Sequence, residues 1–400
     1  MQELTITGKY TEAVCRLTDN KETAIDPYAV AQLQRLCDNE TLSGCRLRIM
    51  PDVHPGKVGT IGFTMTIGEK LMPSLVGVDI GCGMTTVKVK TGKIEFQKLD
   101  RVIREKIPYG AGIHRVIIPT VVNCIAYPNP NMLLSQAFAK SLRCGKHIDA
   151  ARALLSFGTL GSGNHFIEID QDPEEKDIYY VTVHSGSRYL GKAVTEYYLT
   201  EGQKALKAAG IQLPYEETYL SGALLSDYLA DLSVVQEFAD KSRKAMLDTI
   251  LKEMKWKALE WTVCRHNYVD FDPETVSVLG SPVLRKGAIS AKAGEHVIIP
   301  INMRDGILLG TGKGNEEWNL SAPHGAGRIL KREDVKSRYT TSQYKKAMEG
   351  IYSPSIGPGT LDEAPFAYRS LPEIREAIGE TVTIDKIITP VYNFKAGGEE

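Results

Sequence analysis

The chain has 400 residues, with 48 Lys and Arg against 49 Asp and Glu, which gives a formal net charge of −1 at pH 7. This balance excludes a polybasic nucleic-acid binder, although it leaves room for a local basic groove. Hydrophobic residues make up 42% and charged residues 24%, so the chain can bury a sizeable core and wholesale disorder is excluded. No apolar stretch approaches the roughly 18 residues of a membrane-spanning helix, and the first residues do not resemble a secretory signal. We therefore expect a soluble, cytoplasmic protein without a membrane partner.

In chain order, the first 75 residues indicate short strands and turns, with one helix near Asp26–Asp38, where an Asp-Pro pair is typical of a helix start. Strands are then predicted at 75–78, 84–90 and 276–301. Helical periodicity is present at 131–156, 195–209 and 220–257. No Pro- or Ser-rich linker divides the chain. We predict an α+β fold with one large domain over residues 1–400 and a mainly helical segment at about 190–260.

The seven cysteines are an odd number and include no CxxC pair, which argues against a disulfide framework and a zinc ribbon. Six of them, at positions 15, 37, 45, 124, 144 and 264, are expected to be small buried hydrophobic residues. Cys82 differs because it lies in a glycine-rich turn, GVDIGCGM at 77–84, three residues after Asp79. The glycines would let the carboxylate and the thiol converge on one point.

Five of the eight histidines lie in short turns that contain Gly, Ser or Asn: His54, His165, His184, His266 and His324. Such a turn presents the imidazole with little bulk around it, which suits a metal ligand or a nucleophile. The alternative is five unrelated surface or capping histidines.

Asp79, Cys82, His165, His184 and His266 form a mixed donor set that suits a divalent ion such as Mn, Zn or Co. Five protein ligands exceed one tetrahedral catalytic site, so two ions that share the thiolate are predicted. The alternative is a buried cysteine beside an aspartate that caps a turn.

Glycines also concentrate at 306–327, where six occur. The sequence GTGKG at 310–314 fails as a P-loop because its spacing is wrong and no Ser or Thr follows the lysine. The segment could still offer backbone amides to phosphates, with Arg304, Lys313 and Arg328 as cations.

Seven segments, in order along the chain, resemble motifs of the RtcB family of RNA ligases. They are DVHPG at 52–56, GVDIGCG at 77–83, GSGNHFIE at 161–168, VHSGSR at 183–188, HNY at 266–268, RKGA at 285–288 and HGAGR at 324–328. The resemblance implies mixed or antiparallel sheets around a central metal site, with flanking helices. It also implies a GTP- and Mn-dependent ligase that joins RNA 3′-phosphate or 2′,3′-cyclic phosphate ends to 5′-hydroxyl ends. The expected route passes through a guanylylated histidine and an RNA-(3′)pp(5′)G intermediate, in RNA repair or tRNA splicing.

The resemblance also assigns roles to residues. His324 is expected to be the guanylylated nucleophile, and two Mn²⁺ ions bridged by Cys82 are expected on Asp79, Cys82, His165, His184 and His266. Nucleotide contacts are expected from Asn164, Phe166, Glu168, His266, Asn267, Pro300, Met303, His324, Gly325, Ala326, Gly327, Tyr368 and Lys395. Contacts to RNA or its phosphates are expected from Arg188, Arg328, Asp52 and His54.

One segment departs from the family pattern. Where many members have Pro-Gly-Ser-Met-Gly, this chain has PINMRDG at 300–306, which adds bulk, a cation and a carboxylate. We expect a different donor affinity or preference for RNA ends. The altered loop also fits a metal-dependent RNA-end phosphoesterase that lacks the sealing step, and a third alternative is a noncatalytic protein that binds RNA ends.

The expected partners are GTP, RNA with broken ends such as tRNA halves or cleaved RNA, and an activating protein. RNA contact is also suggested by the densest basic stretch, which contains Arg328, Lys331, Arg332, Lys336, Arg338, Lys345 and Lys346. This stretch is either a groove for a phosphate backbone or an ordinary charged helix surface.

Overall fold

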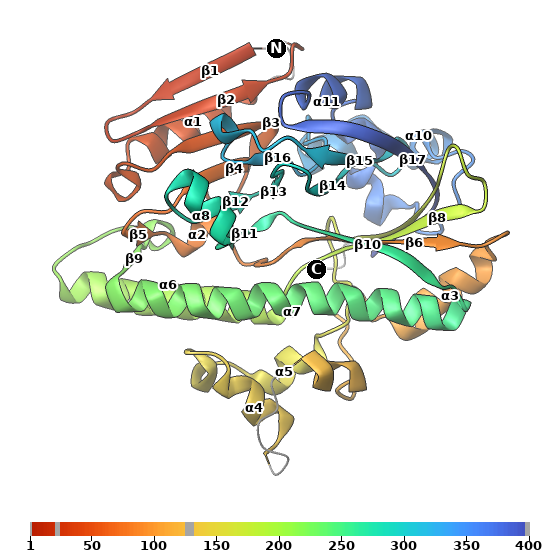
Figure 1. Cartoon of the computed structure of the whole chain (residues 1–400), viewed down its shortest axis with the longest axis horizontal. Helices are drawn as coiled ribbons and strands as arrows, with labels where there is room; N and C mark the ends of the chain where they lie inside the picture. The colour runs from red at the N-terminus through yellow and green to blue at the C-terminus, as the bar shows by residue number, and fades with distance from the viewer. Residues whose placement is uncertain (1, 21–24, 125–131, 397–400) are drawn as a thin grey trace.

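Two β-sheets, crossed by long helices, form the framework of the computed structural model of this chain (Figure 1). The structure describes residues 2–20, 25–124 and 132–396. The mixture of helices with largely antiparallel sheets confirms the predicted α+β class.

The first sheet has six strands and is antiparallel except for the parallel pair β2 and β3. In spatial order its strands are β1 (Gln2–Thr7), β2 (Glu12–Leu17), β3 (Leu47–Pro55), β4 (Thr60–Thr66), β12 (Val283–Lys286) and β11 (Asn267–Asp270). Helix α1 (Pro27–Cys37) packs against β1 and β3. It begins where expected, because the Asp26 carboxylate accepts a hydrogen bond from the Tyr28 amide and Pro27 needs no donor there.

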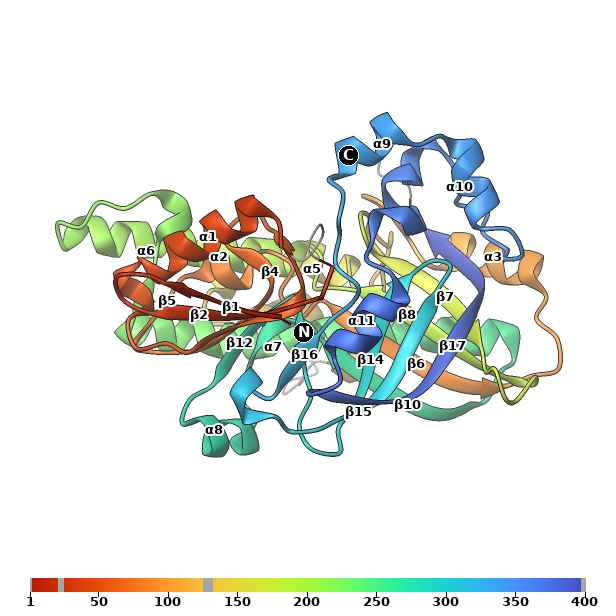
Figure 2. The same ribbon diagram turned by 90° about the horizontal axis from the view of Figure 1, so that it is seen from above.

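The second sheet has seven strands and curls until its two edges, β10 and β14, touch (Figure 2). In spatial order its strands are β10 (Ala258–Arg265), β6 (Gly83–Lys90), β8 (Ile178–Ser185), β7 (Phe166–Gln171), β17 (Val382–Lys395), β15 (Gly306–Gly312) and β14 (His296–Asn302). Alternation along each strand divides its two faces. Val87, Ile167 and Val181 pack outward against helices α3 (Phe96–Lys106) and α7 (Gly222–Met254), so Phe166 and Glu168 face the inside of the curl.

Two short strand pairs complete the sheets: β13 (Ala288–Ser290) with β16 (Ser321–Pro323), and β5 (Lys70–Leu71) with β9 (Leu220–Ser221). The remaining helices are α2 (Pro73–Val76), α4 (Leu134–Lys140), α5 (Ala150–Leu155), α6 (Tyr189–Ala208), α8 (Pro273–Leu279), α9 (Arg332–Arg338), α10 (Thr341–Ala347) and α11 (Leu371–Ala377). Among the described residues, no helix combines the length and the apolar character needed to cross a bilayer.

Helix α7 links the two sheets. It packs against β6 and β8 of the second sheet and against β11 of the first, and it runs beneath both in Figure 1. Buried residues recur along it at helical spacing, as in Tyr228, Leu232, Val235 and Ala239. The helices predicted at 195–209 and 220–257 correspond to α6 and α7.

Three predicted segments differ from the structure. The strand predicted at 75–78 is wrong, because Pro73 starts the helical turn α2 and Gly77, with a φ of +85°, ends it. The segment 276–301 contains β12, β13 and most of β14, but it opens inside helix α8. The helical segment 131–156 is divided into α4 and α5, and its first residue, Asn131, lies outside the described residues.

Candidate metal centre and adjoining cavity

Four of the five predicted metal ligands lie at one end of the second sheet. β6 starts directly after Cys82, β7 starts directly after His165, His184 is the penultimate residue of β8, and β10 ends directly before His266. These strands are neighbours in the order β10-β6-β8-β7, and each is antiparallel to the next. The starts of β6 and β7 therefore lie beside the ends of β8 and β10, at one end of the sheet. The pairing of the strands alone brings the four side chains together.

The fifth residue, Asp79, comes from the turn between α2 and β6. The Cys82 amide donates a hydrogen bond to the Asp79 carbonyl at 3.1 Å, and Gly81 at φ +73° lets the chain bend there. The Asp79 carboxylate lies over Gly186, where an added Cβ would come within 1.9 Å of its Oδ1. This contact explains why a glycine follows His184 and Ser185 in the VHSGSR segment.

The ligand atoms of the five residues converge. Nε2 of His165 lies 3.1 Å from Oδ2 of Asp79 and 3.5 Å from Sγ of Cys82. Nε2 of His184 lies 3.3 Å from the same sulfur and 3.2 Å from Nε2 of His266. Two triplets result, Asp79 with Cys82 and His165, and Cys82 with His184 and His266; in each, all ligand atoms lie within 4.8 Å of one another. Cys82 belongs to both.

The histidines are oriented as metal ligands usually are. Nδ1 of His165 lies 2.9 Å from the Leu160 carbonyl, and Nδ1 of His184 lies 3.0 Å from the Asn164 carbonyl. Because a carbonyl can only accept, Nδ1 carries the proton and Nε2 presents its lone pair to the cluster. Burial lowers the pKa of His184 and the pKa of His266 well below the ordinary value, so both rings are neutral.

The electrostatics of the cluster also fit a cation. Burial and the neighbouring Asp79 carboxylate raise the pKa of the Cys82 thiol, so a thiolate at this position needs a compensating positive charge. Although burial opposes ionisation of Asp79, the facing His165 ring lowers the pKa of that carboxyl when Nε2 carries a proton, and a metal ion bound by both groups would take the place of that proton. Neutral imidazoles, a thiol and a carboxylate are donors that a borderline divalent ion accepts. The cluster could therefore hold a metal ion.

His324 follows β16 and lies beside this cluster. Its ring centroid is 4.9 Å from that of His266, and its Nδ1 is 2.6 Å from Oδ2 of Asp52. Asp52 is fully buried, and its expected contact with RNA stays a prediction. Its carboxylate orients the His324 ring, which leaves Nε2 of His324 free.

A cavity adjoins the metal-ligand cluster and is bordered by His324. Of the thirteen predicted nucleotide contacts, twelve line it: Asn164, Phe166, Glu168, His266, Pro300, Met303, His324, Gly325, Ala326, Gly327, Tyr368 and Lys395. Asn267 lies outside this lining, and its Oδ1 accepts a hydrogen bond from the Gly287 amide at 3.0 Å.

The other predicted RNA contacts lie in different places. His54 and Arg328 line the cavity, and burial lowers the pKa of His54 to about 4, which keeps its ring neutral. Arg188 lies outside the lining and donates a hydrogen bond to the Gly110 carbonyl at 3.1 Å.

The phosphate cradle expected from residues 306–327 is not one surface. Residues 306–312 form β15, the Lys313 side chain donates to the Gly379 carbonyl, and Arg304 forms an ion pair with Asp305. Only the end of the segment, from His324, reaches the cavity.

Sequence analysis missed Glu363, which lines the cavity and organises its cations. The Glu363 carboxylate lies 2.6 Å from Nζ of Lys395, 2.7 Å from Nη1 of Arg332 and 3.0 Å from Nη1 of Arg328, and it accepts a hydrogen bond from the Tyr368 hydroxyl. Although burial opposes its ionisation, these cations lower the pKa of Glu363 to about 2. A signal was present, since Glu363 opens the segment EAPFAY that ends at Tyr368. We call these five residues the Glu363 cluster.

A second buried acid, Glu168, lies on the inner face of β7. Burial raises the pKa of Glu168 to about 7, while its hydrogen bond from the Asn393 amide acts in the opposite direction. Asp170, two residues further along the same face, is also fully buried, and burial raises its pKa well above the ordinary value.

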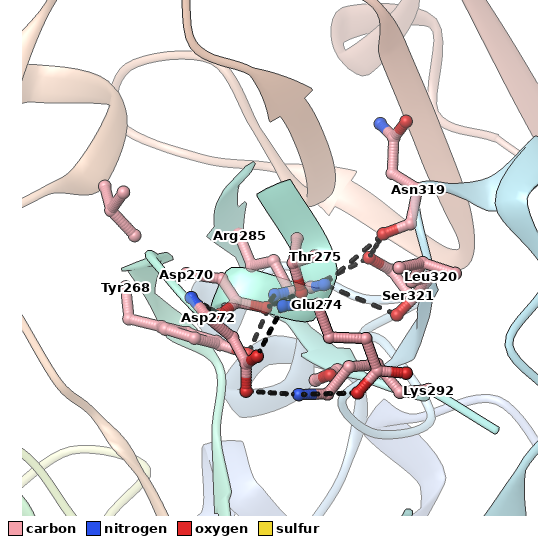
Figure 3. Close-up of polar contacts among 12 residues, drawn as sticks. Tyr268, Asp270, Asp272, Glu274, Thr275, Arg285, Lys292, Asn319, Leu320 and Ser321 are labelled. Atoms are coloured by element: carbon pink, nitrogen blue, oxygen red, sulfur yellow. Dashed lines mark hydrogen bonds and ion pairs between the residues drawn. The ribbon is translucent and has the colours of Figure 1, made fainter. Parts of the chain in front are cut away.

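The HNY and RKGA segments are joined by a buried arginine, whose contacts are shown in Figure 3. Arg285 is fully buried, and its guanidinium donates hydrogen bonds to Asp270, to the Tyr268 hydroxyl and to Ser321 at 2.6–2.9 Å. These bonds tie β11 and β12 to β16. The strand after His266 and the strand before His324 are thereby fixed relative to each other.

The comparisons with known proteins agree with this geometry. A family model described as "tRNA-splicing ligase RtcB" matches residues 35–396. The chain is 30% identical to the RNA-splicing ligase RtcB of Escherichia coli K12 over 376 residues, which cover 84% of this chain and 87% of the relative. It is 26% identical to the tRNA-splicing ligase RtcB of Nanoarchaeum equitans over 413 residues, which cover 85% of each chain. The chain belongs to the RtcB family.

Proposed function

We propose that this chain is a GTP- and Mn²⁺-dependent RNA ligase that joins RNA 3′-phosphate or 2′,3′-cyclic phosphate ends to 5′-hydroxyl ends. The names of its relatives, RNA-splicing and tRNA-splicing ligases, support an RNA ligase. The observation that carries the proposal is the position of His324, whose ring lies 4.9 Å from that of His266 at the border of the cavity.

His324 is suited to be the nucleophile. With Nδ1–H donated to Asp52, the lone pair of Nε2 can attack the α-phosphorus of GTP, which forms a P–N bond and releases pyrophosphate. An oxygen of the RNA 3′-phosphate then displaces His324 and takes over the GMP, giving RNA-(3′)pp(5′)G. The 5′-hydroxyl of the second RNA end attacks the 3′-phosphorus, the phosphodiester forms and GMP leaves. A 2′,3′-cyclic phosphate is first opened to the 3′-phosphate.

Asp79, Cys82, His165, His184 and His266 would hold two Mn²⁺ ions, with Cys82 between them. Ions bound there would neutralise phosphate charge near the nucleophile.

The cavity lining would bind the nucleotide. Phe166 and Tyr368 offer rings for the base, and Glu168 offers acceptor oxygens to its N–H groups. Lys395 offers a cation, and the backbone at Gly325–Gly327 leaves room for phosphates beside His324. His54 and Arg328, at the border of the cavity, are proposed to face RNA.

We propose RNA with broken ends, including tRNA halves, as the substrate, in repair or in tRNA splicing within the cytoplasm. An activating protein belongs to the proposal as a further partner.

The test is transfer of GMP to the protein. Incubation with α-labelled GTP and Mn²⁺ should give a covalent, acid-labile adduct that His324→Ala loses. His296→Ala is the matched control, because His296 is exposed on β14 and lies outside the cavity lining, so it should keep the adduct. Absence of an adduct with Mn²⁺, Zn²⁺ and Co²⁺ alike would contradict the proposal.

A second candidate is a metal-dependent RNA-end phosphoesterase without the sealing step. It is favoured by the 300–306 loop, where Met303 lies in the cavity lining, with its sulfur 3.0 Å from the Tyr344 hydroxyl, and Asn302 donates to Asp305. Opening of a cyclic phosphate without any sealed product, at every GTP concentration, would favour this candidate.

A further inference from the structure

Arg243 is a fully buried cation directly behind the metal-ligand cluster. It projects from α7, and its Nη1 donates hydrogen bonds to the Gly81 carbonyl at 2.8 Å and to the Ser185 carbonyl at 2.6 Å. Its Nε donates to the Thr85 hydroxyl at 3.1 Å. Gly81 precedes Cys82 and Ser185 follows His184, so one guanidinium holds the backbone beside two predicted ligands.

The contact reaches a third ligand through a neighbouring acid. Asp240, one turn earlier on α7, accepts a hydrogen bond from Arg243 with one oxygen and from Nε of Arg265 at 2.7 Å with the other. Arg265 directly precedes His266. The chain Arg243–Asp240–Arg265 therefore connects α7 with the segments that carry Cys82, His184 and His266.

Packing alone does not account for this arginine. A buried apolar side chain of similar volume is usually at least as stabilising as a buried ion pair, because charges lose their hydration. The fold also brings α7 unusually close to the ligand turn, since a Cβ at Gly81 would lie 2.9 Å from the Cα of Gln236. The N–H groups of Arg243 thus bind the backbone carbonyls next to Cys82 and His184, whose positions set the positions of these ligands.

We propose that Arg243 is a positioning residue for the metal centre. It fixes the backbone on either side of the Cys82–His184 contact and places a permanent positive charge behind the thiolate. The inference deepens the proposed function, because it depends on a metal at the cluster, but it makes no assumption about GTP or RNA.

The experiment uses Co²⁺ as a spectroscopic probe with the full-length chain. Arg243→Met keeps the bulk and removes the charge and the donors, whereas Arg243→Lys keeps the charge but cannot reach all of the acceptors. We expect Arg243→Met to weaken Co²⁺ binding about 10- to 100-fold and to shift the thiolate-to-cobalt absorption band, which is the size of effect seen when groups that orient ligands are removed. Arg243→Lys should fall between Arg243→Met and the unmodified protein.

The matched control is Asp231→Asn on the same helix. Asp231 is buried and accepts hydrogen bonds from the amides of Arg143 and Cys144 and from the Tyr198 hydroxyl, away from the ligand cluster. This variant should lower the thermal stability of the metal-free protein while leaving Co²⁺ affinity and spectrum unchanged. It separates lost stability from lost ligand geometry.

Unchanged Co²⁺ affinity and spectrum in Arg243→Met, measured well below its melting temperature, would overturn the inference. If Arg243→Met does not fold, Asp240→Asn and Arg243→Lys decide the question by the same two readouts. Failure of the proposed function looks different: the unmodified protein would bind Co²⁺ through Cys82 but form no adduct with GMP.

Discussion

The metal-ligand cluster and the Glu363 cluster border the same cavity, yet their polar atoms have opposite surroundings. In the metal-ligand cluster, the imidazole lone pairs of His165 and His184 face the Cys82 sulfur at 3.5 and 3.3 Å. In the Glu363 cluster, one carboxylate meets three cations, Lys395, Arg332 and Arg328, and the Tyr368 hydroxyl, so the negative charge of the carboxylate is already compensated.

This difference separates two uses of a buried polar group. Several acceptors that converge on a single weak S–H donor are stabilised by a cation that joins them, which points to a metal ion. A carboxylate surrounded by cations needs no ligand and instead holds those cations at fixed places along a cavity wall. The following predictions test that contrast, beginning with the largest expected effect.

Cys82→Ala should abolish metal binding, because both triplets share the Cys82 sulfur. We expect Co²⁺ affinity to fall by more than about 100-fold, beyond the effect of losing a group that only orients a ligand. Titration followed by absorption measures it. Cys264→Ala is the control, since Cys264 is also buried but lies outside both triplets. Binding of Co²⁺ by Cys82→Ala with nearly unchanged affinity would contradict the assignment.

Glu363→Gln should destabilise the fold and spare the metal centre. The substitution leaves Arg328 and Lys395 without their carboxylate, and breaking one side of a buried ion cluster costs about 3 kcal/mol or more. Urea unfolding measures the change, with Glu333→Gln at an exposed position of α9 as the control. A large loss of Co²⁺ affinity in Glu363→Gln would show that the two clusters are not independent.

The same carboxylate should also make stability depend on acid pH. Its folded pKa of about 2 lies below the ordinary value of 4.5, so the unfolded chain binds more protons between these values. The contribution of Glu363 is therefore complete above 4.5 and is lost as the pH falls through 2. The difference in unfolding free energy between the unmodified protein and Glu363→Gln should shrink over this window; a constant difference would exclude the ion cluster as its cause.

Glu168 should have the opposite pH dependence. Its folded pKa of about 7 lies above the ordinary value of 4.5, so the folded protein binds the extra proton and stability falls as the pH rises from 4.5 to 7. Glu168→Gln should flatten that slope in urea unfolding. If Glu168 accepts hydrogen bonds from a nucleotide base, GTP binding should strengthen over the same rise in pH, as isothermal titration would show; binding that weakens with rising pH would argue against an acceptor role.

The smallest effect is expected from Lys331→Ala. Arg328 and Arg332 of the basic stretch are engaged by Glu363, so Lys331, which is exposed between them, is the better probe of a groove. Removing one phosphate contact lowers the slope of log affinity against log salt by about 1. RNA binding measured at several salt concentrations tests this, with exposed Lys204→Ala on α6 as the control. If Lys331→Ala and the unmodified protein have equal slopes, the basic stretch is a charged helix surface and not a groove for RNA.

A cap signal in the sequence predicted one helix, α1. Asp26 and Pro27 form the cap of α1. The same Asp-Pro pair at residues 272–273 starts α8, a helix that was not predicted because the segment from residue 276 was assigned to strands. The apolar residues 75–78 were read as a strand because periodicity cannot separate a short buried helix from a buried strand. Here the deciding residues, Pro73 and Gly77, stand at the ends of the segment.

The candidate site was predictable where the chemistry lies in short motifs. The histidines in glycine-containing turns and Cys82 were predicted as metal ligands or nucleophile from their local sequence. Most of the predicted nucleotide contacts line the cavity. The contact between Asp52 and His324 was not predicted, because the two residues are distant in the sequence. Arg243 was missed for the same reason, because a charge inside a helix carries no local sign of what it will contact. Glu363 was missed although it opens the segment that ends at Tyr368.

Because the ligands lie at the ends of four neighbouring strands, the complete ligand set forms only when these strands pair in the correct register. A slip of one residue between β6 and β8 would turn His184 to the other face of the sheet, away from Cys82. A misaligned chain could still be compact, but it would have no complete set of donors. Loading with metal would thus discriminate correctly assembled molecules from near-native ones during folding.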